Sequence, residues 1–431
     1  MHIKIDQIIE GEIETIAFGG EGILRHNHFV VFVPFTAIGD RISCKIKEVK
    51  SSFAKAELVE LIKKSDGRAT PLCPYFGSCG GCQLQHLQPV PQLNYKLSAV
   101  QDALKRIGHL SPPSISIIPA GENWGYRRHI TLHLKPKDKG FEAGYIALDN
   151  HSLTVVQECP IFIRSDVLIL EMVQKWIKGI PNPERIEGRL TILKNQHQQF
   201  ILSFQFETQF SAELKFFENL LKQSTDLAGI MIQTSIKETI FGNPYCEEII
   251  EGLTFRYSPK TFVQNHPGQS LNIYNQICQL VDQSKQHHVL DLYCGFGITS
   301  LLLAKRGHTV TGIECNKEAI VFGQANATFN KLKNNHFIQG DVEKILPKWL
   351  KTNRAEIIIV NPPRQGLTKK VIEQLLTSSA QSMIYISCMP ATLARDLNLL
   401  AKEYYIADGQ AYDMFPQTAH VETLIHLKRK N

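Results

Sequence analysis

Apolar and polar residues alternate in short runs over the first 60 or so residues of the chain. The runs at 11–25, 28–37 and 40–50 are broken by Gly-Gly at 19–20 and Gly-Asp at 39–40. A period of two places every second side chain on one face of a strand, and glycine-containing turns join such strands. We therefore expect residues 1–62 to form a small β-barrel or sandwich.

The middle of the chain mixes the two periodicities. Apolar residues at helical spacing predict a helix over 92–110, which the prolines at 112 and 113 stop. Between about 122 and 255, strand-like runs at 128–134, 190–194 and 200–206 surround one predicted helix at 165–179. This composition indicates an α+β domain.

From about residue 262 the pattern becomes a regular alternation of strand and helix. The predicted strands cover 287–295, 308–314, 335–341, 355–363 and 382–388, and a helical segment follows each. Such alternation indicates a parallel sheet covered by helices on both faces, which is an α/β fold of the Rossmann-like kind.

Charge and composition do not predict a membrane-spanning helix, and they give little evidence about the partner of this protein. The net charge of +6 is weak evidence for a nucleic-acid partner, although residues 96–139 carry a basic run. That run is explained as well by a solvated face. No stretch reaches the twenty or so apolar residues of a membrane span, and the first residues are polar and acidic, so we expect a cytoplasmic protein without membrane contact.

A glycine-containing turn follows the strand predicted at 287–295. It runs from Asp291 through Tyr293, Gly295 and Gly297, and Glu314 ends the next strand. Such a turn lets the backbone approach a ligand, and an acid at the second strand can hold ribose hydroxyls. No GxGxxG or phosphate loop is present, which favours a nucleoside cofactor over a dinucleotide. A Rossmann-like fold that binds another ligand stays open.

Two further strands end in chemically capable side chains. Asn361 and Arg364 follow the strand at 355–363, Cys388 ends the strand at 382–388, and Glu422 stands near a last strand. Residues at the carboxyl ends of parallel strands face the ligand crevice. Taken alone, Cys388 is as easily a buried structural cysteine.

A cysteine cluster lies between the first two domains. Cys73, Cys79 and Cys82 have the spacing C-x5-C-x2-C, and Cys159 is a fourth candidate. Four thiolates suit a [4Fe–4S] cluster or a tetrahedral zinc, and the spacing does not choose between them.

The motifs together resemble a known family. Phe262-Val263-Gln264, DLYCGFG, NPPRQG, SCMP and DMFPQTAHVE follow one another as in the RNA 5-methyluridine (uracil-C5) methyltransferases. Residues 9–42 resemble a TRAM domain, an RNA-binding barrel of OB type, and the cysteine segment resembles the iron–sulfur branch of the family. The resemblance covers essentially the whole chain.

The resemblance implies a fold and a domain organisation. We expect a class I methyltransferase domain of Rossmann-like α/β fold, an N-terminal OB-type β-barrel (TRAM) and an α+β central domain that carries an iron–sulfur loop. The expected boundaries are 1–62 for the barrel, 69–90 with 122–255 for the central domain, and 91–121 with 256–431 for the methyltransferase domain.

The resemblance also implies an activity. S-adenosylmethionine would methylate C5 of a uridine in RNA, with 23S rRNA a better match than tRNA, and the cluster would be [4Fe–4S] rather than zinc. Cys388 would add to C6 of the base, and Glu422 would remove the C5 proton. We expect a monomer.

The remaining site residues are carried over from the same motifs. The predicted cofactor-binding residues are Gln264, Asp291, Tyr293, Gly295, Gly297, Glu314, Asp341 and Asn361. Gln264, Asn361 and Arg364 are predicted to contact the substrate, and Cys73, Cys79, Cys82 and Cys159 to bind the metal cluster.

Two residues depart from the family pattern. Asn361 stands where the family has an aspartate, and Met389 where it has an asparagine. Asn-Pro-Pro also occurs in methyltransferases that act on the amino group of adenine, but those place an aromatic residue where this chain has Arg364. A 5-methylcytidine enzyme and a catalytically silent RNA-binding protein stay open as well.

Overall fold

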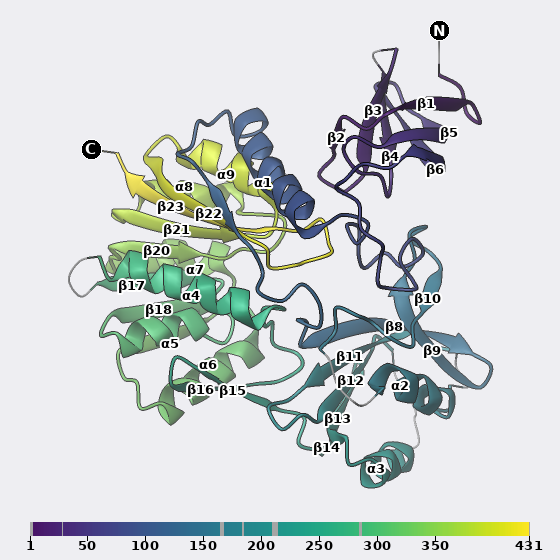
Figure 1. Ribbon diagram of the computed structural model, residues 1–431. Coiled ribbons are helices and arrows are strands. Elements are labelled where there is room, and N and C mark those ends of the chain that lie inside the picture. Colours follow the sequence, from purple (N-terminus) through teal and green to yellow (C-terminus); the bar gives the residue numbers. More distant parts are fainter. Residues whose placement is uncertain are drawn as a thin grey trace.

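A computed structural model describes residues 3–27, 29–163, 168–182, 185–208, 214–283 and 287–430. Figure 1 shows three larger sheets in separate parts of the molecule, with the N-terminal strands apart from the C-terminal α/β body. Among the described residues, no helix is both long and apolar enough to cross a membrane.

The N-terminal part is a six-stranded sheet in the order β1-β5-β6-β4-β3-β2. Its strands are β1 Ile8–Glu12, β2 Thr15–Ile16, β3 Gly22–His26, β4 Phe29–Val33, β5 Arg41–Val49 and β6 Phe53–Lys63. Leu24, Val31 and Ile42 are fully buried between the strands. The period-two pattern therefore predicted these strands correctly, because every second apolar side chain points into this core.

The central part is a seven-stranded sheet in the order β10-β9-β8-β11-β12-β13-β14. Its strands are β8 His129–Lys137, β9 Gly140–Ile146, β10 Leu153–Val155, β11 Gly188–Lys194, β12 Phe200–Phe206, β13 Leu227–Gln233 and β14 Glu238–Gly242. The helices α2 Ile169–Lys178 and α3 Leu214–Gln223 belong to this part, and a hairpin of β15 Cys246–Ile250 and β16 Leu253–Tyr257 follows. The expected α+β composition is confirmed; residues 165–167 of the predicted helix lie outside the described residues.

The C-terminal part is an eight-stranded sheet in the order β19-β18-β17-β20-β21-β23-β22-β7. Its strands are β7 Ser116–Ile118, β17 His288–Leu292, β18 Thr309–Glu314, β19 Asn335–Gln339, β20 Ile357–Val360, β21 Ser382–Ser387, β22 Tyr404–Tyr412 and β23 Glu422–Arg429. Its helices are α1 Pro89–Arg106, α4 Pro267–Val281, α5 Ile298–Lys305, α6 Lys317–Phe329, α7 Val342–Thr352, α8 Lys369–Thr377 and α9 Pro390–Leu400. One apolar cluster contains Val289 and another contains Leu290, so successive residues of β17 supply opposite faces of the sheet.

The parallel sheet predicted for the strands between 287 and 388 is confirmed for β17 to β21, and the sheet continues beyond them with an antiparallel strand. β23 runs antiparallel to both β21 and β22. Residues 413–421 alone join β22 to β23, which is too short for the crossover that a parallel pair requires. The antiparallel strand brings the start of β23 to the end of β21.

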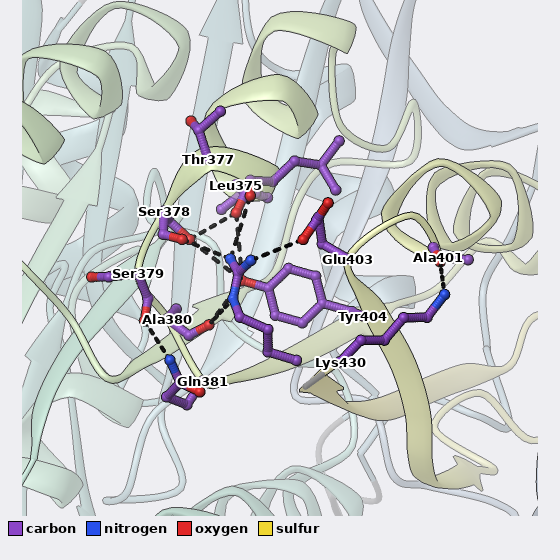
Figure 2. A network of polar contacts seen from close by, with 12 residues as sticks. Leu375, Thr377, Ser378, Ser379, Ala380, Gln381, Ala401, Glu403, Tyr404 and Lys430 are labelled. Atoms are coloured by element: carbon purple, nitrogen blue, oxygen red, sulfur yellow. Dashed lines mark hydrogen bonds and ion pairs between the residues drawn. The ribbon is translucent and has the colours of Figure 1, made fainter.

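The last strand is fixed by a network at its end (Figure 2). Arg429 donates hydrogen bonds to the carbonyl oxygens of Ser378, at 2.6 Å, and Ala380, at 3.0 Å, and pairs with Glu403. Its guanidinium also lies 4.6 Å from the ring centroid of Tyr404. A cation beyond the end of α8 satisfies carbonyls that the helix leaves unpaired, which holds β23 in register.

Candidate active site

A cavity opens at the carboxyl ends of β17 and β20. The chain proceeds from β17 to β18 on one side and places β20 on the other, so the order of strands reverses here. Ligands of open α/β sheets bind at such a point. Five of the predicted cofactor residues line the cavity: Gln264, Asp291, Tyr293, Gly295 and Asn361.

The turn after β17 has an unusual backbone. Tyr293, Gly295 and Gly297 have φ values of 62°, 56° and 82°. A Cβ at Gly297 would also lie 2.5 Å from the ring of Phe337. Glycine is therefore required at 297 by both conformation and space, which accounts for one glycine of the predicted motif.

Asp291 lies at the floor of this cavity and is 2% exposed. Burial raises the pKa of its carboxyl to about 7, although Ser300 Oγ donates a hydrogen bond to it at 2.6 Å. A buried carboxyl with a raised pKa in a cavity is typical of a functional site.

The other three predicted cofactor residues do not line the cavity. Glu314 lies at the end of β18 and accepts hydrogen bonds from the backbone N–H groups of Gly295, at 3.2 Å, and Asn316, at 2.8 Å. Asp341 is the N-cap of α7 and accepts from Glu343 N at 2.8 Å. Gly297 begins α5. A role for these residues in cofactor binding stays a prediction.

Cys388 and Glu422 come together through strand register. Ser387 of β21 pairs with Thr423 of β23. Cys388 follows Ser387 and Glu422 precedes Thr423, so in this antiparallel pair the two residues lie on the same side of that contact. The pairing places a thiol and a carboxyl side by side at the edge of the sheet that carries the cavity.

Burial of this pair favours the neutral forms of both side chains. Burial and then the charge of Glu422 raise the pKa of the Cys388 thiol. Burial raises the pKa of Glu422 to about 8. Arg364 opposes both shifts, and it also hydrogen-bonds to Cys388. Arg364 is therefore the group that stabilises a thiolate here.

The loops that carry Arg364 and Cys388 are joined to each other. Thr392 Oγ1 is 3.1 Å from the carbonyl oxygen of Arg364 and 3.2 Å from that of Met389. Arg395 donates to the carbonyl oxygen of Gln365 at 2.9 Å. The N-terminal half of α9 thus fixes both loops.

The four predicted cluster cysteines line a second cavity, between the 73–82 segment and the central sheet. Cys73, Cys79, Cys82 and Cys159 all contribute to its wall. Tyr145 Oη lies 3.7 Å from Cys159 Sγ, and Gly81 N donates to Cys79 Sγ at 3.3 Å. Burial raises the pKa of Cys79 to about 11 and of Cys82 to about 12.

The four thiols are suitable donors for a metal group, but they lie too far apart to hold one. In the described ranges, no three Cys, His, Asp or Glu side chains converge closely enough to hold a metal ion. Four thiols around one cavity are nevertheless the donors that an iron–sulfur cluster or zinc takes, and a bound cation would lower their pKa values. Binding would need the thiols to approach each other more closely than they do here.

Some residues that line the two cavities were not predicted as site residues from the sequence. Arg127 and Tyr145 line the cysteine cavity, and Tyr274 and Cys294 line the cavity at β17. Arg127 stood only in a basic run, and Tyr145 and Tyr274 belong to no motif. Cys294 lies inside the DLYCGFG motif but received no role.

Comparisons with known proteins decide the family. A family model described as tRNA (Uracil-5-)-methyltransferase matches residues 92–430, and a TRAM domain model matches residues 7–59. The chain belongs to the RNA uracil-5-methyltransferase family. The methyltransferase carries the TRAM domain at its N-terminus, as the resemblance implied.

Relatives agree with this assignment. An uncharacterized RNA methyltransferase of Protochlamydia amoebophila is 55% identical over 429 residues, 99% of each chain. An uncharacterized RNA methyltransferase of Halalkalibacterium halodurans is 30% identical over 451 residues, which cover 100% of this chain and 98% of that one. The methyltransferase is therefore an enzyme of RNA modification that uses S-adenosylmethionine.

A solved structure shares the fold. The crystal structure of Pyrococcus abyssi tRNA (uracil-54, C5)-methyltransferase in complex with S-adenosyl-L-homocysteine has a TM-score of 0.77 and 23% sequence identity. The likeness covers 97% of this chain and 99% of that one. The expected α/β methyltransferase architecture with an N-terminal TRAM domain is thereby confirmed.

Proposed function

We propose that this methyltransferase modifies C5 of a uridine in 23S rRNA through a covalent adduct between Cys388 and C6 of the base. The observation that carries the proposal is the pairing of Ser387 with Thr423, which brings Cys388 and Glu422 together beside the cavity at β17. A nucleophile and a base are needed at one carbon–carbon bond, and this pair supplies both.

Cys388 makes the base reactive. Its thiolate sulfur bonds to C6, and the electron pair of the C5–C6 double bond moves toward C5 and O4. S-adenosylmethionine supplies an electrophilic methyl group to C5 and departs as S-adenosylhomocysteine. Arg364 supports the attacking form of Cys388, since it hydrogen-bonds to the thiol and carries a positive charge.

Glu422 completes the reaction. Its carboxylate takes the proton from C5, the C5–C6 double bond forms again, and the bond between C6 and sulfur breaks with its electron pair returning to Cys388. The carboxyl is buried and its pKa lies near 8, so it is well matched to proton transfer near neutral pH.

The cavity at β17 is the proposed site for S-adenosylmethionine. Gln264, Asp291, Tyr293, Gly295 and Asn361 line it, and we propose that Gly297, Glu314 and Asp341 complete the site around the turn. Asn361 lines this cavity and stands three residues before Arg364 in the chain, and we assign Asn361, Gln264 and Arg364 to the target base as well. The uridine must leave any helical stack to present C5 and C6.

We propose a [4Fe–4S] cluster on Cys73, Cys79, Cys82 and Cys159, with zinc as the second choice. Support comes from four thiols that share one cavity. The methyl transfer needs no electron donor or acceptor, so the cluster would hold the segment in shape rather than exchange electrons.

The proposed target and organisation follow the family resemblance. The TRAM domain and the cysteine segment favour 23S rRNA, whereas the name of the Pyrococcus abyssi protein refers to tRNA. We propose a cytoplasmic monomer with domains at 1–62, at 69–90 with 122–255, and at 91–121 with 256–431. The N-terminal strands would form the OB-type barrel that binds RNA.

Nucleoside mass spectrometry of 23S rRNA and tRNA, from cells with and without this gene, tests the proposal. We expect 5-methyluridine to disappear from one position or more of 23S rRNA. Loss from tRNA alone would contradict the target. Loss of an N-methyladenosine or of 5-methylcytidine would contradict the reaction, and unchanged RNA would favour a silent RNA-binding protein.

A further inference from the structure

The loop between β22 and β23, residues 413–421, leads directly to Glu422. Side chains from distant parts of the sequence hold it. Lys96 of α1 donates to Asp413 and to the carbonyl oxygen of Phe415, and Tyr126 donates to the carbonyl oxygen of Pro416 at 3.0 Å. The loop that leads into Glu422 is therefore held by contacts from outside the sheet.

Gln417 is the most constrained residue of this loop. It is 4% exposed and has a φ of 70°, a conformation that glycine or asparagine adopts more easily. Glutamine in this conformation is strained, so the contacts of the residue have to offset the cost.

All the polar groups of Gln417 have partners. Its backbone N–H donates to Gln92 Oε1 at 3.0 Å, and its Oε1 accepts from Gln92 Nε2 at 3.0 Å. Its carbonyl oxygen accepts from the backbone N–H groups of Gln83, at 3.1 Å, and Leu84, at 2.9 Å. Its Nε2 donates to the carbonyl oxygen of Asn123 at 3.4 Å.

Gln417 and Ala419 connect this loop to the residues that follow the cysteine segment 73–82. Gln83 follows Cys82, and Gln83 Oε1 accepts from Ala419 N at 3.2 Å. Gln83 and Leu84, which follow the cysteine segment, and Gln92 of α1 thus hold the backbone of residues 417–419 by hydrogen bonds. From Ala419 the chain needs three more residues to reach Glu422.

We infer that Gln417 is a positioning residue for Glu422, through which α1 and the cysteine segment fix the carboxyl that removes the C5 proton. The inference rests on the proposed role of Glu422. Loss of the grip leaves Cys388, directly after β21, and the cavity at β17 in place, because neither contacts Gln417 in this network. The attack on C6 and the methyl transfer therefore persist, whereas release of the adduct slows.

Gln417→Gly tests the inference, because glycine tolerates the positive φ while the side chain and its hydrogen bonds to Gln92 and to the carbonyl oxygen of Asn123 are removed. On uridine-containing RNA we expect turnover to fall by about 10- to 100-fold, with accumulation of a denaturation-resistant complex between protein and methylated RNA. Binding of S-adenosylmethionine should stay unchanged. Gln92→Leu, which leaves Gln417 intact and removes its partner, should give the same accumulation.

Gln174→Ala is the matched control. Gln174 is a buried glutamine of α2 whose Nε2 donates to the carbonyl oxygens of Ala143, at 2.6 Å, and Val156, at 3.0 Å. It should lose stability without accumulating the complex. Glu422→Gln tests the role of Glu422 as the base separately from the role of Gln417 in positioning it. If Glu422→Gln accumulates the complex and both Gln417→Gly and Gln92→Leu do not, the inference is overturned; if Glu422→Gln itself does not, the proposed base is wrong.

Discussion

Ser387 of β21 pairs with Thr423 of β23, one residue before Cys388 and one residue after Glu422. An ordinary contact of an antiparallel ladder thus sets the separation of the proposed nucleophile and the proposed base. Glu422 begins β23 and is paired with Tyr412 of β22, whereas Cys388 directly follows the last residue of β21. The reaction assigned to them needs such fixed placement, since addition and proton removal occur at adjacent carbons.

The first prediction concerns stability and pH. The pKa of Glu422 is raised to about 8 in the folded protein, from 4.5 when it is unburied. Between these two pKa values the folded state therefore binds more protons than the unfolded state. The contribution of Glu422 to stability is fully present below about pH 4.5 and is lost as the pH rises through 8. Relative to Glu422→Gln, the wild type should become less stable across this window.

Thermal unfolding midpoints of both proteins between pH 5 and pH 9 measure this difference. Asp291, whose pKa is also raised, is present in both proteins, so its contribution cancels. A difference in midpoint that does not change with pH would show that Glu422 ionises normally in the folded protein.

The second prediction concerns base selectivity. Asn361 can accept a hydrogen bond from N3–H of uracil, and its amide can also donate to N3 of cytosine. An aspartate accepts only, and does so through a stronger, charge-assisted bond. Asn361→Asp should therefore raise kcat/KM for uridine by about tenfold and lower any activity toward cytidine. Competition between RNAs that differ by one target base measures it, and equal selectivity in both proteins would remove Asn361 from base contact.

The third prediction concerns the buried ion pair of Lys96 and Asp413. Lys96 is fully buried and Asp413 is 3% exposed. Lys96→Met leaves the carboxylate without its counter-charge, which should destabilise the protein by about 3–5 kcal/mol. Lys96→Met/Asp413→Asn should recover most of that loss, because neither charge is then buried. A double variant no more stable than Lys96→Met, by thermal unfolding, would contradict this account.

Lys96 also marks a limit of what the sequence can predict. Its place in a basic run suggested a solvated face or an RNA contact, whereas it lies buried against Asp413, more than 300 residues away in the chain. Charge counted along a sequence does not reveal which cations are paired in the fold. The grip of Gln92 and Gln83 on Gln417 was invisible for the same reason.

Local pattern, by contrast, predicted much of the fold and the strand ends that carry the candidate site residues. The glycine turn between Asp291 and Gly297 and the strand ends at Asn361 and Cys388 depend on residues close in sequence. The antiparallel insertion of β23 between β21 and β22 depends on pairing between distant strands, so the sequence did not predict it. The sequence could place Glu422 near a strand but not beside Cys388.

The most direct test of the covalent mechanism uses RNA in which the target uridine is replaced by 5-fluorouridine. Fluorine at C5 cannot leave as a proton, so an adduct that has received the methyl group cannot release Cys388. In the presence of S-adenosylmethionine the wild type should form a denaturation-resistant complex with this RNA, linked at Cys388, and Cys388→Ala should form none. Absence of the complex in the wild type, or methylation of ordinary RNA by Cys388→Ala, would contradict the mechanism.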